Sequence, residues 1–177
     1  DGTPRLIPGH NLSLVTLGAF ILWVGWFGFN AGSTLKVDVN LGLIALNTHL
    51  AAAAGAVGAV LALRSTASPI LLTTTVNGAL GGLVGITAGC ASMAPGFAIL
   101  TGLIAGFLVV YGMALMDALR LDDVVGAVPV HGMAGMWGTL AAGLFFSGDL
   151  FNLDRVMIQL LGIAVAFLWV FPIALLM

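Results

Sequence analysis

Charge is the scarcest property of this sequence. Only 7% of its 177 residues are charged, and glutamate is absent. A soluble domain carries about 25% charged residues, so this chain cannot cover a water-facing surface. Five Lys and Arg residues with a net charge of −2 also exclude a basic patch that would bind nucleic acid. Without glutamate a common carboxylate for general acid–base catalysis is missing, and we expect no enzymatic activity.

Cysteine is nearly absent as well. Cys90 is the only one, which excludes an internal disulfide and any CxxC metal site, and we expect neither a metal nor a cofactor. The chain is instead 60% hydrophobic, with 25 glycines and a mean hydropathy of +1.17. This composition predicts a multi-pass protein of the cell membrane, with the lipid bilayer as its surroundings.

The few charged residues divide the chain into apolar intervals. The longest intervals without Asp, Lys or Arg cover residues 6–35, 39–63, 65–116, 124–148 and 156–177. About 20 apolar residues cross the hydrocarbon core, and the third interval has room for two spans with a Gly- and Pro-containing break at 89–96. We therefore predict an all-α transmembrane helix bundle of about six spans, near residues 14–34, 42–63, 69–88, 96–118, 126–147 and 156–177.

The ends and the basic residues add two expectations. The chain starts without Met and stops on an apolar run, so we expect a fragment of a longer protein. Six spans place two groups of basic residues on opposite sides of the membrane, and the larger group marks the cytoplasmic side. The two groups are Arg5, Arg64 and Arg120, and Lys36 and Arg155.

Glycines recur at helical spacing in three places. Small residues on a helix face let neighbouring backbones approach, which favours close packing within lipid. A tight bundle explains each motif by itself, and a narrow pore also needs such a bundle. The motifs are Gly78, Gly81, Gly82 and Gly85; Gly102 and Gly106; and Gly132, Gly135 and Gly138.

Histidines within apolar segments are candidate functional residues. His10 precedes the first predicted span and is interpreted as a surface residue, whereas His49 is interpreted as a bridge between two helices. His131 follows Pro129 in an uncharged run and would share a helix face with Gly135 and Gly138. A neutral imidazole there offers one donor and one acceptor to a small polar solute. The alternative is a hydrogen bond to a neighbouring helix.

An aromatic face on the first predicted span is the second candidate. Trp26, Phe29 and Ser33 stand at offsets of zero, three and seven, hence on one side of a helix. Aromatic faces attract cations by about 0.5 to 2 kcal/mol, and a hydroxyl one turn further accepts a hydrogen bond from the same cation. The alternative is an aromatic belt at the membrane interface.

The order of these segments resembles the ammonium transporter family (Amt/MEP/Rh). Residues 25–33 (GWFGFNAGS) are similar to the family's sixth-helix signature, and 47–53, 78–87, Asp122-Asp123 and 130–132 (VHG) follow in the family's order. The resemblance implies a homotrimer of eleven-helix subunits, each with a pore between two inverted repeats. Residues 1–177 would be a partial domain, the second repeat and the last helix, with the required first repeat missing.

The resemblance also implies roles for the candidates. His131 matches the second of two pore histidines, Phe29 an aromatic that gates the outer mouth, and Ser33 the hydroxyl of an outer ammonium site. Trp26 would support them. Ammonium, and methylammonium in its place, would be recruited and deprotonated near this mouth, and ammonia would then pass through a narrow hydrophobic pore.

Two departures from the family pattern concern the cytoplasmic end of the pore. Gly126 and Pro129 stand where the family often has Asp and part of a Phe-Gly pair. They are compatible with a branch in which an ammonium sensor is fused to a signalling module, or with a cytoplasmic regulator. A channel for another small neutral solute is the remaining alternative.

Overall fold

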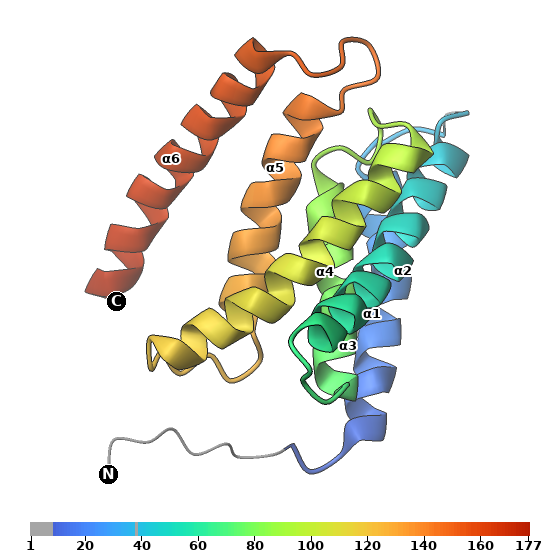
Figure 1. Cartoon of the computed structure of the whole chain (residues 1–177). Helices are drawn as coiled ribbons and strands as arrows, with labels where there is room; N and C mark the ends of the chain where they lie inside the picture. Colours follow the sequence, from blue (N-terminus) through green and yellow to red (C-terminus); the bar gives the residue numbers. More distant parts are fainter. Residues whose placement is uncertain (1–8, 38) are drawn as a thin grey trace.

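Helices alone build the described chain. The computed structural model describes residues 9–37 and 39–177, and no strand occurs within them. Successive helices run in opposite directions (Figure 1). The predicted all-α class is confirmed, and each predicted span coincides with one helix or, at 126–147, with two. The elements are α1 (Leu12–Gly32), α2 (Leu41–Ser65), α3 (Leu72–Thr87), α4 (Pro95–Ala118), the π-helix η1 (Val128–Met133), α5 (Ala134–Leu144) and α6 (Leu153–Leu176).

The helices differ in whether they can cross a membrane unaided. By length and composition α1, α2, α4 and α6 are long and apolar enough. By contrast, α3 has 16 residues, and α5 has 11 after the 6 of η1. At 1.5 Å per residue α3 covers about 24 Å, less than a hydrocarbon core of about 30 Å. Four spans are thus supported directly, and spanning by α3 and by η1–α5 stays a prediction.

The basic residues lie at opposite ends of the bundle, in the two predicted groups. Arg64 lies in the last turn of α2 and Arg120 follows α4, whereas Lys36 lies between α1 and α2 and Arg155 in the first turn of α6. Arg5 lies outside the described residues. We call the end that carries Lys36 and Arg155 the outer end.

The centre of the bundle is formed by α2, α3 and α4, whose backbones touch at glycines. A Cβ atom on Gly102 would lie 2.1 Å from the Ala51 carbonyl oxygen, and one on Gly106 would lie 2.1 Å from the Gly55 carbonyl oxygen. A Cβ atom on Gly82 would likewise lie 2.2 Å from the Ala51 carbonyl oxygen. No side chain fits at these distances, so the predicted close packing is confirmed for the first two glycine motifs.

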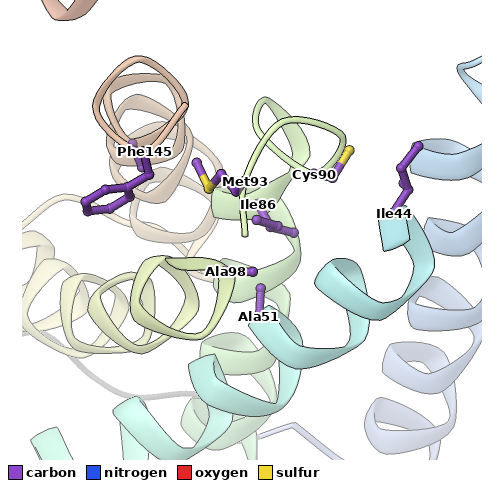
Figure 2. Packing of buried hydrophobic residues seen from close by; sticks show 8 residues of the cluster. Ile44, Ala51, Ile86, Cys90, Met93, Ala98 and Phe145 are labelled. Atoms are coloured by element: carbon purple, nitrogen blue, oxygen red, sulfur yellow. The ribbon is translucent and has the colours of Figure 1, made fainter. Parts of the chain in front are cut away.

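An apolar cluster fills the outer half of the bundle, under the loop between α3 and α4. Met93 and Cys90 reach into it from this loop, and the Phe145 ring stacks on Phe97 with centroids 4.7 Å apart. Burial raises the pKa of the Cys90 thiol, so the single cysteine is an unreactive core residue. The cluster comprises Ile44, Ala51, Ile86, Cys90, Met93, Ala98, Ala141 and Phe145 (Figure 2).

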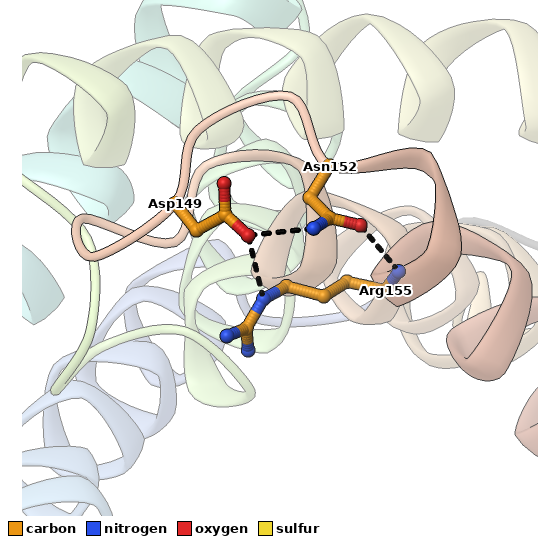
Figure 3. Close-up of polar contacts among 3 residues, drawn as sticks. All are labelled: Asp149, Asn152 and Arg155. Atoms are coloured by element: carbon orange, nitrogen blue, oxygen red, sulfur yellow. Dashed lines mark hydrogen bonds and ion pairs between the residues drawn. The ribbon is translucent and has the colours of Figure 1, made fainter.

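The first and last helices lie at the periphery. α1 packs against α2 and α3. Among the described helices α6 packs against α5 alone, and none of its residues is buried. A polar corner at the outer end fixes the start of α6 (Figure 3). Asn152 accepts a hydrogen bond from the Arg155 backbone N–H at 3.1 Å and donates to Asp149 at 2.6 Å. The Arg155 guanidinium lies 4.1 Å from the centroid of Phe146, so its charge stays at this end of the helix.

Candidate functional site

The aromatic face predicted on α1 is present at its outer end. The rings of Trp26 and Phe29 meet edge to face, with centroids 5.9 Å apart and planes at 70°. Ser33 caps the helix one turn further, and its hydroxyl donates to the Phe29 carbonyl oxygen. A hydroxyl that donates in this way keeps its own lone pairs free to accept from a cation. The three residues therefore form one surface, which we call the aromatic mouth.

The two rings of the aromatic mouth are held differently. Trp26 is half-buried, and its Nε1 donates to the Thr87 hydroxyl of α3 at 2.9 Å. That hydroxyl in turn donates to the Leu83 carbonyl oxygen at 2.8 Å. Phe29 is 58% exposed, and its ring lies edge to face against that of Trp26. Trp26 is consequently fixed against α3, and Phe29 is the more exposed of the two rings.

His131 lies in the π-helix η1. This helix begins beside Pro129, which has no N–H to donate, and single π-turns occur frequently at functional sites. The His131 side chain is exposed, and within residues 9–37 and 39–177 it has no hydrogen bond or ring contact. The alternative interpretation, a hydrogen bond to a neighbouring helix, is therefore not what the described part of the chain shows.

The prediction that His131 shares a helix face with Gly135 and Gly138 stays a prediction, although a neighbouring helix covers one of the two glycines. A Cβ on Gly138 would lie 2.1 Å from the Gly85 carbonyl oxygen, so this glycine is closed off by α3. A Cβ on Gly135 would lie 3.6 Å from a Val84 methyl group of α3, an ordinary van der Waals contact, and His131 is exposed. The third glycine motif thus packs closely at Gly138 only.

Sequence reasoning missed the residue that anchors η1. Asp123 accepts two backbone hydrogen bonds, from the N–H of Ala127 at 2.7 Å and of Val128 at 2.8 Å. A carboxylate at a helix N-terminus satisfies amides that have no partner in the helix and complements its dipole. An acidic residue shortly before a Pro-containing helix start was the available signal. Asp123 holds the turn from which His131 projects.

The aromatic mouth and His131 do not touch each other. α1 packs against α2 and α3, whereas η1 packs against α3, α4 and α5, and no contact joins α1 to η1 within the described chain. Both border α3, which Trp26 contacts through Thr87. Within the described chain, α3 is thus the helix that contacts both α1 and η1. Within the same described residues, no group of three or more His, Cys, Asp or Glu side chains lies together as a metal site.

Comparison with known proteins identifies the family. The sequence matches the Ammonium Transporter Family over residues 1–177. The chain belongs to the ammonium transporter family. It is 52% identical over 152 residues to the ammonium transporter Amt2 of Archaeoglobus fulgidus, which covers 84% of this chain and 32% of the relative.

Solved structures of ammonium transporters share the fold. A sensor Amt protein superposes with a TM-score of 0.93 at 40% identity, covering 99% of this chain and 45% of the other. Mep2 of Candida albicans gives a TM-score of 0.87 at 25% identity, covering 97% and 42%. The chain thus spans about a third of the length of the curated relative and less than half of these solved chains. With its apolar helices, this ammonium transporter chain is a multi-pass membrane protein.

The two departures from the ammonium transporter pattern have local structural reasons. Gly126 has a φ of +73°, and a Cβ there would lie 2.9 Å from the Asn77 side-chain nitrogen. Asn77 donates to the Val125 carbonyl oxygen at 3.0 Å, which brings this loop against α3. Pro129 is buried and packs against Gly112 of α4. An aspartate at 126 would be strained here, and the glycine suits the turn.

The two other histidines behave as interpreted. The His49 ring lies against Trp23 and Phe27 of α1, with centroids 5.4 Å and 6.4 Å away, and so bridges α1 and α2. His10 is exposed and precedes Asn11, whose side chain caps α1 by accepting from the Leu14 backbone N–H at 3.0 Å. Neither residue belongs to the aromatic mouth.

Proposed function

We propose that the protein carries ammonium nitrogen across a membrane, with ammonium bound at the aromatic mouth and deprotonated there or just inside it. The observation that carries this proposal is the shared surface of Trp26, Phe29 and Ser33, which offers π-faces and a hydroxyl acceptor at one point. Membership of the ammonium transporter family supports the same substrate. The role is that of a transporter rather than an enzyme.

The chemistry of the aromatic mouth and of the surroundings of His131 suits a solute that is charged at the first and neutral at the second. Ammonium at the mouth is attracted by the quadrupoles of the rings and donates a hydrogen bond to the Ser33 hydroxyl oxygen. Deeper along the helices the surroundings are apolar, and an unpaired charge there costs far more than a neutral molecule. Ammonia is neutral and small. We infer that ammonium transfers its proton to water at the outer mouth and that ammonia is the species that passes His131. The imidazole donates or accepts one hydrogen bond as ammonia passes.

The lining of this pore is completed by protein outside the described residues. Phe29 and His131 are exposed, which leaves both side chains available for contact with a further protein surface. We propose that a first repeat supplies this surface and that three subunits assemble, each with its own pore. The exposed apolar residues of α1 and α6 provide surface for such contacts or for lipid.

Reconstitution tests the proposal. The full-length protein in proteoliposomes should take up methylammonium with saturation, compete for it with ammonium, and give a current or pH change on an ammonium gradient. Residues 1–177 alone should give no saturable flux, because half of the lining is absent. Ammonium binding without any flux in the full-length protein would overturn transport and support a sensing role. Flux of urea or water without ammonium would support a channel for a neutral solute.

A further inference from the structure

α1 carries the aromatic mouth, yet it has a single buried residue. Of its 21 residues only Asn30 is buried. The Asn30 side-chain amide donates to the Thr48 hydroxyl of α2 at 2.9 Å, and Thr48 donates in turn to the Ile44 carbonyl oxygen at 2.7 Å. Thr48 is fully buried. Both residues belong to the described bundle, so this hydrogen bond does not depend on protein or lipid that packs around α1.

The position of Asn30 determines where its neighbour points. Asn30 follows Phe29 directly, and successive residues of an α-helix are rotated by about 100°. The rotation of α1 that brings Asn30 onto α2 therefore fixes the direction of Phe29. One turn earlier, the bond from Trp26 to Thr87 ties the same helix to α3. Two hydrogen bonds to two different helices thus set the rotation of α1 at the mouth.

An asparagine at position 30 lowers the stability of the fold relative to an apolar side chain. Its side-chain oxygen is buried and has no hydrogen-bond partner. A buried acceptor without a partner is destabilising, and an apolar side chain of similar branched shape would avoid that loss. Each such group needs an explanation, and here the amide supplies a direction that an apolar side chain cannot supply. Its geometry points to a role in placing the mouth.

We propose that Asn30 is a positioning residue of the aromatic mouth. Through Thr48 it holds α1 at the rotation in which Phe29 and Ser33 face the same solute. This inference rests on the proposed function for its transport consequences, whereas the rotation of α1 is independent of any transport.

Three substitutions in the full-length protein test the transport consequence. Thr48→Val removes the hydroxyl with little change of shape, Thr48→Ser retains it, and Thr74→Val removes a buried hydroxyl far from the mouth, in the first turn of α3. We expect Thr48→Val to raise the half-saturating ammonium concentration about tenfold, as loss of a buried hydrogen bond does. It should also weaken discrimination against potassium, whereas Thr48→Ser and Thr74→Val should resemble the wild type in both.

A labelling measurement tests the rotation without transport. Phe29→Cys, in a background with Cys90→Ala, is reacted with a membrane-impermeant maleimide. Thr48→Val should change the labelling rate several-fold, and Thr48→Ser and Thr74→Val should not. Equal labelling rates and equal ammonium affinities in all three variants would overturn the positioning role. If the wild type carries no ammonium but labelling still responds to Thr48→Val, the proposed function fails and the rotation by Asn30 stands.

Discussion

The central and the peripheral helices of this bundle are specified in different ways. α2, α3 and α4 meet through glycine backbones, where a single added methyl group would collide with a carbonyl oxygen. α1 and η1, which carry the candidate site, have exposed side chains and are held by a few polar contacts: Asn30 to Thr48, Trp26 to Thr87, and Asp123 to two amides. Close backbone packing therefore fixes the positions of the central helices, and individual hydrogen bonds fix the position of the candidate site. Substitutions in the centre should thus unfold the protein, and substitutions in the site should alter its function.

The largest effect is expected at the centre. Gly102→Ala places a Cβ 2.1 Å from the Ala51 carbonyl oxygen, so α4 must move away from α2. We expect a loss of about 3 kcal/mol or more of stability, the range of severe overpacking. Thermal unfolding of the full-length protein in detergent measures it. Gly96→Ala is the matched control, because it lies in the same helix with no neighbour within 4 Å. Equal melting temperatures for the two variants would contradict the shape argument.

The next largest effect is expected at His131. His131→Ala should leave the melting temperature nearly unchanged because the side chain is exposed, yet transport should fall or lose selectivity for ammonium over potassium by about tenfold or more. His131→Glu restores an ionisable group and should favour passage of a charged species. Electrophysiology beside methylammonium uptake separates the two variants. His49→Ala is the control, since its loss of contact with Trp23 should lower stability without altering selectivity. Identical transport by the wild type, His131→Ala and His131→Glu would show that the solute does not pass His131.

The sequence predicted the centre better than the site. Charged residues and the break at 89–96 mark helix ends, and glycine spacing marks the close contacts at Gly102 and Gly106. Both signals are local, so a single sequence carries them. The aromatic mouth was also predictable, because Trp26, Phe29 and Ser33 lie within two turns of one regular helix.

The remaining features depend on tertiary packing. Pro129 indicated a disturbed helix. Whether the disturbance becomes a π-turn depends on how the proline ring packs against Gly112 of α4. Asn30 was visible as a polar residue in an apolar helix, but Thr48 lies 18 residues away, so only the packed bundle identifies its partner.

A smaller effect is expected at Asp123, which holds the turn before His131. Asp123→Ala removes both backbone hydrogen bonds, and helix caps of this kind contribute about 1 kcal/mol. We expect transport to fall several-fold through misplacement of His131, with a modest decrease in melting temperature. Asp123→Asn keeps one accepting oxygen and should lie between alanine and the wild type. The exposed neighbour Asp122 provides the control. If Asp123→Ala and Asp122→Ala transport alike, the cap does not position His131.

The smallest effect is expected at Phe29, where one ring of the aromatic mouth is lost and Trp26 remains. A cation–π contact at an exposed site contributes about 1 kcal/mol, so Phe29→Ala should raise the half-saturating ammonium concentration about fivefold. Phe29 is 58% exposed, and its removal leaves no cavity in the described bundle, so folding should change little. Phe20→Ala is matched to it in helix and in exposure, at 59%, but lies two turns further from Ser33. Ammonium affinity and selectivity of the two variants are compared by measuring uptake and currents at equal expression. If both variants keep wild-type affinity and selectivity, Phe29 belongs to an interfacial aromatic belt and ammonium enters elsewhere. If only Phe29→Ala loses affinity, a residue that contributes almost nothing to the packed centre contributes directly to recognition.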